Sequence, residues 1–312
     1  MKVAFVFPGQ GSQSPRMLDG FKNNKVVKNT IEEASDVLGK DLSKIIDGEH
    51  KDLLNSTVNT QPIILAVSFA IWRVFLDRNG PLPNLIAGHS LGEYTALAVS
   101  GVMNFEQALK LVSFRANSMQ NAVPEGVGGM AAIIGLDAGT VKRICNECST
   151  SIHKVEPANI NANDQIVVSG QNEIIDKVCV SAKQFGARRA VKLSVSAPFH
   201  SSLMAPAAKQ LEGRLKNEKF LLPKITVINN VDVDFLKSID QIKTSLSKQA
   251  MAPVRWKETV EKFRDNQIKI ICECGPGKVL TGLTKRICPE IQSYSFANEE
   301  DIDECISFLC NK

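Results

Sequence analysis

The stretch Gly88-His89-Ser90-Leu91-Gly92 decides the fold of this 312-residue chain. It matches G-x-S-x-G and lies between a short apolar strand, residues 85–87, and a helix of small residues, 91–100. Glycines on both sides keep side chains out of a sharp strand-to-helix turn. Ser90 then presents its hydroxyl where backbone N–H groups and the helix dipole favour a developing oxyanion. The pattern predicts a nucleophilic serine, and an inert serine in a glycine-rich turn is the alternative.

Strand-like and helix-like stretches alternate on both sides of this turn, which predicts an α/β fold with a mainly parallel sheet. The expected strands of the larger domain are residues 3–7, 85–87, 225–228 and 269–273. Its expected helices are 61–76, 91–100, 105–121, 202–215, 235–247, 256–264 and 278–287, on apolar spacing near 3.6 or on apolar length.

The order of elements changes to β-α-β-β-α-β between residues 125 and 195, which is the order of a ferredoxin-like unit. Strands are expected at 130–134, near 160, at 165–169 and at 190–193, with helices at 138–148 and 173–185. We therefore expect an α/β-hydrolase-like domain formed by 1–124 and 196–312, with a ferredoxin-like subdomain, 125–195, inserted into it.

Composition excludes several classes of protein. The chain is 44% hydrophobic and 22% charged, with a net charge of +4, which is ordinary for a soluble globular protein and too mild to indicate nucleic-acid binding. The N-terminal apolar run ends at Pro8 and is too short for a signal peptide, and no stretch approaches the roughly 18 apolar residues of a membrane span. We expect a cytoplasmic protein that does not bind a membrane.

Eight cysteines include one C-x-x-C pair, Cys145 and Cys148, on an expected helix. No second pair follows at zinc-site spacing, so reduced thiols are favoured over metal binding. Neither a metal nor a cofactor is expected.

A serine needs a base, and the chain has four histidines. His50 lies in a polar stretch and is expected at the surface, and His153 falls on a loop of the inserted unit. His89 should point away from Ser90 in a tight turn. His200, on a proline-containing loop after a strand, is the best candidate for the base. From spacing alone, an exposed or helix-capping histidine remains an equal alternative at that position.

These residues belong to a longer pattern that resembles bacterial malonyl-CoA:acyl carrier protein transacylases essentially end to end. The matching motifs are FPGQGSQ (7–13), GHSLGE (88–93), MQ (119–120), VPEG (123–126), PAN (157–159), PFHS (198–201) and GPGKVLTGL (275–283).

The resemblance implies a Ser-His pair without a carboxylate. Ser90 is then the nucleophile, His200 the base, and the backbone carbonyl of Gln249 orients the imidazole. The oxyanion hole is implied to consist of the backbone N–H groups of Gln10 and Leu91.

The resemblance also assigns the acyl pocket. Arg115 is implied to bind the free carboxylate of malonate, which penalises acyl groups lacking that carboxylate. Phe199 is implied to narrow the pocket against branched acyl groups, and Met119 to contact the substrate. Without the resemblance, Arg115 is interpreted as a surface-helix arginine and Phe199 as a core phenylalanine.

The implied reaction is ping-pong transfer of malonyl from malonyl-CoA, through a Ser90 ester, to the phosphopantetheine thiol of acyl carrier protein, with release of coenzyme A. We expect a monomer that supplies fatty-acid biosynthesis. Carrier proteins are acidic, so a basic rim is expected, and an ordinary solvated face is the alternative. Two clusters are candidates: Arg188, Arg189 and Lys192, and Lys278, Lys285 and Arg286. A serine hydrolase or thioesterase, and a non-catalytic carrier-binding module, are the rival functions.

Overall fold

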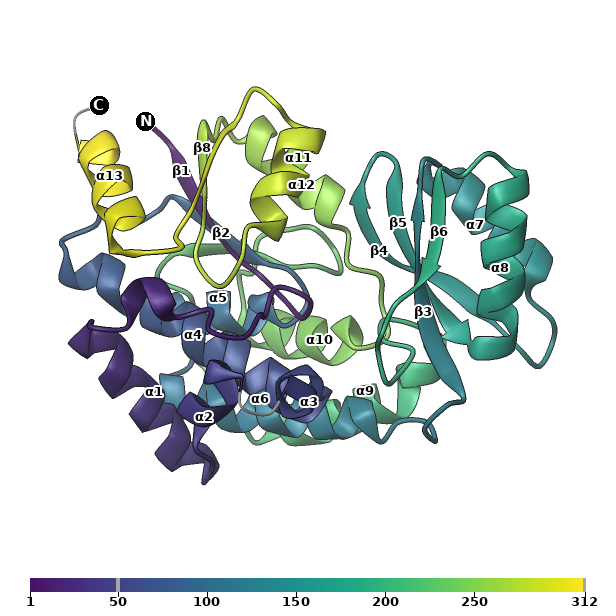
Figure 1. Cartoon of the computed structure of the whole chain (residues 1–312), viewed down its shortest axis with the longest axis horizontal. Coiled ribbons are helices and arrows are strands. Elements are labelled where there is room, and N and C mark those ends of the chain that lie inside the picture. Colours follow the sequence, from purple (N-terminus) through teal and green to yellow (C-terminus); the bar gives the residue numbers. More distant parts are fainter. Residues whose placement is uncertain (49–50, 311–312) are drawn as a thin grey trace.

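The computed structural model describes residues 1–48 and 51–310, so His50 lies outside the described residues. Figure 1 shows two units side by side, a larger one that holds both ends of the chain and a smaller one in teal. The larger unit contains a parallel sheet and the smaller one an antiparallel sheet. This arrangement confirms the predicted fold class.

The parallel sheet has five strands in the order β7-β2-β1-β8-β9. They are β1 (Val3–Phe7), β2 (Leu85–Gly88), β7 (Thr226–Ile228), β8 (Ile270–Glu273) and β9 (Gln292–Ser295). β1 is central and all of its residues are buried, because helices cover both faces of the sheet. A strand buried on both faces has a continuous apolar sequence, as VAFVF does.

Helices of the larger unit surround this sheet. Those before the small unit are η1 (Asp19–Phe21), α1 (Lys25–Leu38), α2 (Leu42–Asp47), α3 (Lys51–Asn55), α4 (Thr57–Asp77), α5 (Gly92–Val99) and α6 (Phe105–Gln120). Those after it are η2 (Ser202–Met204), α9 (Ala205–Lys216), α10 (Ile239–Gln249), α11 (Trp256–Asp265), α12 (Val279–Ile287) and α13 (Glu299–Cys310).

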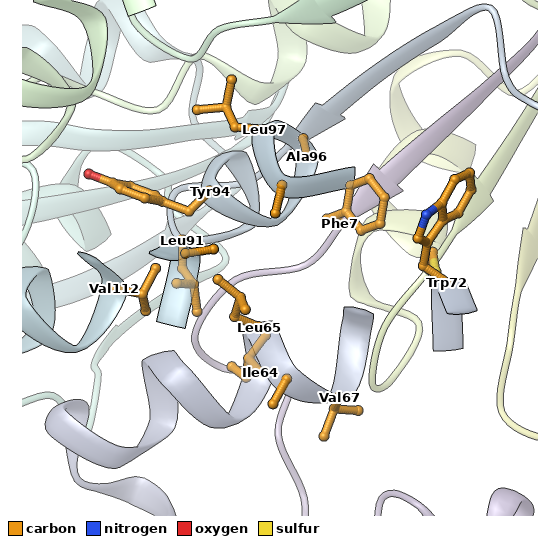
Figure 2. Close-up of a cluster of buried hydrophobic side chains, with 14 of the residues drawn as sticks. Phe7, Ile64, Leu65, Val67, Trp72, Leu91, Tyr94, Ala96, Leu97 and Val112 are labelled. Atoms are coloured by element: carbon orange, nitrogen blue, oxygen red, sulfur yellow. The ribbon is translucent and has the colours of Figure 1, made fainter. Parts of the chain in front are cut away.

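Helix α4 is the centre of the main core. Contrary to the expectation that no stretch approaches a membrane span, its length and composition alone would allow it to cross a membrane. However, 83% of its most apolar window is buried inside the protein. Figure 2 shows side chains of α4, α5 and β1 gathered in this core, among them Leu65, Trp72, Tyr94 and Phe7. Because Phe7 ends β1 and Tyr94 lies in the first turn of α5, this packing fixes the segment that carries Ser90.

The antiparallel sheet has the order β4-β5-β3-β6, which is the strand order of a ferredoxin-like unit. Its strands are β3 (Gly128–Ile134), β4 (Val155–Ala162), β5 (Gln165–Gln171) and β6 (Arg189–Lys192), and its helices are α7 (Ala138–Cys148) and α8 (Asn172–Gln184). A separate apolar cluster lies between this sheet and its two helices. Cys145 is buried in that cluster and Cys148 lies half-buried on the same helix.

Two predicted helices begin later than their apolar pattern suggested. The helix expected at 235–247 begins at Ile239, because Phe235 pairs with Ile228 and the Ser238 hydroxyl caps the helix. The helix expected at 202–215 is the 3-10 turn η2 followed by α9, which has a proline in its first turn.

Candidate active site

Ser90 lies on a sharp turn between β2 and α5 and has φ +51°, a left-handed conformation rare for a residue with a side chain. The turn is tight on both sides. A Cβ on Gly88 would lie 1.8 Å from the carbonyl carbon of Gly92, and one on Gly92 would lie 2.0 Å from the backbone oxygen of Phe7. The two glycines of the motif are therefore required by close backbone approach.

Asn230 clamps this turn with its side-chain amide. Its Oδ1 accepts a hydrogen bond from the backbone N–H of Ser90 at 2.8 Å, and its Nδ2 donates to the carbonyl of Gly88 at 2.7 Å. Asn230 follows β7, which neighbours β2 in the parallel sheet, so the carboxyl ends of both strands meet here. Sequence reasoning missed this residue, although sites at the carboxyl ends of neighbouring parallel strands are a general rule.

His200 lies against the serine hydroxyl, with Nε2 2.7 Å from Oγ of Ser90. Its Nδ1 donates to the carbonyl oxygens of Gln249 at 2.9 Å and Ala252 at 3.1 Å. Two carbonyl oxygens only accept, so the proton is assigned to Nδ1 and the Nε2 lone pair faces the hydroxyl. The family resemblance implied the Gln249 carbonyl, and that of Ala252 was not expected.

Burial and the positive charge of Arg115 lower the pKa of His200 to about 3. The imidazole is therefore neutral at neutral pH and able to accept the proton of Ser90. Among the described residues no carboxylate contacts this ring, so the orientation of the base depends on backbone carbonyls.

Arg115 projects from α6 into the same site and is only 1% exposed. Nη2 donates to Oγ of Ser90 and to Oε1 of Gln249, both at 3.0 Å, and Nη1 donates to Oε1 of Gln61 at 2.5 Å. The guanidinium also lies over the ring of Tyr94, 5.2 Å from its centroid. Sequence reasoning did not single out Gln61, and no local motif marks it.

The described chain offers Arg115 no carboxylate within ion-pairing distance, and burial lowers its pKa. The hydrogen-bond acceptors of this buried guanidinium are all neutral oxygens, so its positive charge is uncompensated. Such a group is suited to bind an anion.

The backbone N–H groups of Gln10 and Leu91 have no acceptor in the described chain. Both residues line one cleft of about 100 Å³ together with Ser90 and His200. Unpaired amides beside a nucleophile are suited to an oxyanion. The further predicted residues that line this cleft are Arg115, Met119 and Phe199.

The two remaining described histidines are engaged elsewhere. Nε2 of His89 lies 2.8 Å from Oδ1 of Asn161, its ring packs against Trp256, and burial lowers its pKa. His153 lies on the loop before β4, with Nδ1 3.6 Å from a carboxylate oxygen of Glu173. Neither imidazole contacts Ser90.

Known proteins are similar to this chain in sequence and in fold. Residues 4–298 match the model of the acyl transferase domain. The malonyl CoA-acyl carrier protein transacylase of Haemophilus influenzae is 43% identical over 99% of both chains. The chain belongs to the malonyl-CoA:acyl carrier protein transacylase family.

Solved structures of this transacylase family superpose on the chain over almost its full length. The acyl-carrier-protein S-malonyltransferase of Burkholderia pseudomallei is 48% identical, with a TM-score of 0.96 over 98% of this chain and 100% of that one. A malonyl-transacylase solved in complex with a type II PKS acyl-carrier protein is 43% identical, with a TM-score of 0.97 over 99% of this chain and 100% of that one. The cleft around Ser90 therefore lies in a fold that this family shares.

Proposed function

We propose that this chain transfers the malonyl group from malonyl-CoA to the phosphopantetheine thiol of acyl carrier protein, through an ester on Ser90, and so supplies fatty-acid biosynthesis. The observation that carries the proposal is the convergence of two side chains, an imidazole and a guanidinium, on one hydroxyl oxygen. The Oγ of Ser90 lies 2.7 Å from Nε2 of His200 and 3.0 Å from Nη2 of Arg115. A base and a carboxylate-binding cation thus meet at one nucleophile.

In the first half-reaction the hydroxyl of Ser90 attacks the thioester carbonyl and its proton moves to Nε2 of His200. The carbonyl oxygen, now negative, accepts hydrogen bonds from the free backbone N–H groups of Gln10 and Leu91. Collapse of the tetrahedral intermediate breaks the C–S bond, and coenzyme A leaves with the proton from the imidazolium. The carrier's thiol then attacks malonyl-Ser90 by the same steps in reverse, and the hydroxyl is regenerated.

Arg115 selects the acyl group. The free carboxylate of malonate forms a charge-assisted pair with the guanidinium, whereas an acetyl group leaves the buried cation without an anion. Met119 and Phe199 line the cleft on which the acyl chain would lie, so a branch on the malonyl α-carbon would press against them.

The two basic clusters that the sequence offers as carrier-docking candidates meet in the fold. Arg188, which precedes β6, and Arg286 of α12 both pair with the carboxylate of Asp164. We therefore infer one docking rim at the junction of the two units, formed by these arginines with exposed Arg189 and Lys285. An acidic carrier would be attracted to this basic rim.

Three further features belong to the proposal. We place the unit boundaries at residues 125 and 195, since β3 to β6 form their own sheet and core within this range. The protein is proposed to be cytoplasmic and monomeric, and its long apolar helix α4 is packed inside the larger unit.

Intact mass after incubation with malonyl-CoA tests the proposal. We expect one malonyl adduct on the wild type, none on Ser90→Ala, and loss of the adduct when carrier protein with a free phosphopantetheine thiol is added. Free malonate as the main product in the presence of carrier would instead indicate a thioesterase. Failure of the wild type to take up any malonyl group would overturn the transfer mechanism.

A further inference from the structure

Glu93, in the first turn of α5, is a fully buried carboxyl group that the transfer mechanism does not use. Its Oε2 accepts hydrogen bonds from Nε2 of Gln249 at 2.8 Å and from the backbone N–H of Asn230 at 3.0 Å. Its Oε1 has no partner among the described residues. A desolvated carboxyl oxygen beside an active site is costly, so its position calls for a reason beyond packing.

The hydrogen bonds of Glu93 determine which way the side-chain amide of Gln249 is turned. Nε2 of Gln249 donates to Oε2 of Glu93 and, at 3.0 Å, to the backbone oxygen of Ser90. Both acceptors lie on the same side of the amide, so Oε1 of Gln249 faces the other way and accepts from Arg115 at 3.0 Å. The reversed amide would direct its NH₂ group at the guanidinium and its oxygen at two acceptors.

The arrangement does not depend on the charge of Glu93. Burial raises the pKa of this carboxyl to about 7, and the nearby charge of Arg115 acts in the opposite direction. A proton, when bound, sits on the unpartnered Oε1 and leaves Oε2 free to accept from Gln249. Glu93 therefore holds the amide in both protonation states.

We propose that Glu93 is a positioning residue for acyl-group selection, which holds Arg115 in its carboxylate-binding position through the side-chain amide of Gln249. This inference rests on the proposed role of Arg115 in binding the malonate carboxylate. It assigns two tasks to Gln249: its backbone carbonyl orients His200, and its side chain transmits the position of Glu93 to the guanidinium.

The readout is the preference for malonyl over acetyl, because an acetyl group has no carboxylate and gains nothing from a well-placed Arg115. Each variant is incubated with equal concentrations of malonyl-CoA and acetyl-CoA, and the initial rates of the two Ser90 adducts are compared by intact mass. A merely structural residue would slow both rates together and leave their ratio unchanged.

Glu93→Ala is expected to lower the malonyl-to-acetyl ratio about 10-fold or more. It removes the acceptor that fixes the side-chain amide of Gln249, and this amide in turn bonds the charged guanidinium of Arg115. Glu93→Gln, which keeps an accepting oxygen, should restore part of the ratio. Gln249→Ala should lower the ratio as far as the double variant Glu93→Ala with Gln249→Ala, because Glu93 acts through that amide.

Glu273 provides the matched control. It is also a fully buried glutamate, but its carboxylate accepts from the backbone N–H groups of Leu280 and Thr281 and so caps α12. Glu273→Ala should lower the melting temperature and leave the malonyl-to-acetyl ratio unchanged.

Arg115→Ala separates the two levels of inference. An unchanged ratio in Arg115→Ala would overturn the proposed role of that arginine and with it the function. A lowered ratio in Arg115→Ala together with an unchanged ratio in Glu93→Ala would overturn the role of Glu93 alone. If Glu93→Ala does not fold, Glu93→Asp replaces it, because the shorter side chain withdraws the carboxylate from Gln249 by one methylene. A lowered malonyl-to-acetyl ratio in Glu93→Asp would support the role of Glu93, and an unchanged ratio would overturn it.

Discussion

At the scale of single residues, the charge of Arg115 is proposed to act on both catalysis and selection. Unpaired, it helps to hold the pKa of His200 at about 3, after the larger effect of burial. When a malonate carboxylate pairs with the guanidinium, the positive charge that opposes protonation of the imidazole is compensated. Under the proposed function the base therefore becomes more basic when a malonyl group is bound, which would couple recognition of the carboxylate to removal of the serine proton.

This coupling predicts the titration of His200. In Arg115→Ala the pKa of the imidazole should rise from about 3, because one of its causes is removed, but it should stay below 6.5 because burial remains. Histidine ring NMR signals followed against pH, with His200→Ala for assignment, measure the shift. Identical titrations in the wild type and Arg115→Ala would contradict the coupling.

The amide of Asn230 is predicted to maintain the strained conformation of Ser90. Asn230→Ala leaves the backbone N–H of Ser90 and the carbonyl of Gly88 without their partners, which should cost about 1–3 kcal/mol of stability. We also expect the rate of malonyl-Ser90 formation to fall about 10-fold or more, because the hydroxyl is no longer held against His200. Urea unfolding and the adduct rate measure the two effects, and a variant that unfolds like the wild type would refute the clamp.

At the scale of elements, the sequence predicts those whose pattern is strong and local. β1 and α7 have their predicted bounds, and α4 contains its predicted range 61–76 but begins earlier, at Thr57. The elements it missed lie at the two ends of the chain: η1, α1, α2, α3, β9 and α13. β9 is an edge strand of partly exposed polar residues, QSYS, so it has neither an apolar run nor alternation to mark it.

Two helical glycines differ in the space around them, so their substitution by alanine should have opposite effects. Gly92→Ala would place a Cβ 2.0 Å from the backbone oxygen of Phe7, so α5 would have to move and soluble folded protein should be lost. Gly213 lies exposed in α9 with nothing within 4 Å of an added Cβ, so Gly213→Ala should stabilise the protein by about 0.5–1 kcal/mol. Soluble yield and thermal unfolding of both variants check the contrast, and a well-folded Gly92→Ala would refute the close approach.

At the scale of the whole molecule, the site is assembled from segments that are far apart in sequence. Ser90 and Arg115 lie before the inserted unit, and His200 and Gln249 lie after it. Motif and resemblance identified these residues, but Gln61, Asn230 and Glu93 act through contacts that only the fold creates. A glutamine amide has no sequence signature for its orientation, so its partners were not predictable.

At the junction between the two units, one carboxylate pairs with two arginines. Asp164 neutralises Arg188 of the small unit and Arg286 of the large one, on the rim where we place the acidic carrier. Asp164→Asn should release both arginines, add one positive charge and lower the KM for carrier protein several-fold at low salt, with the effect fading as salt screens the rim. Reversal of Arg188 and Arg189 to glutamate should raise the same KM.

The KM for malonyl-CoA, whose acyl group binds inside the cleft, provides the internal control for both changes. It should stay at its wild-type value, since Asp164 and both arginines are absent from the lining of the cleft around Ser90. If both KM values shift together, Asp164 acts by holding the two units in register and the rim is not the docking surface. If neither shifts, the carrier approaches from another side of the cleft.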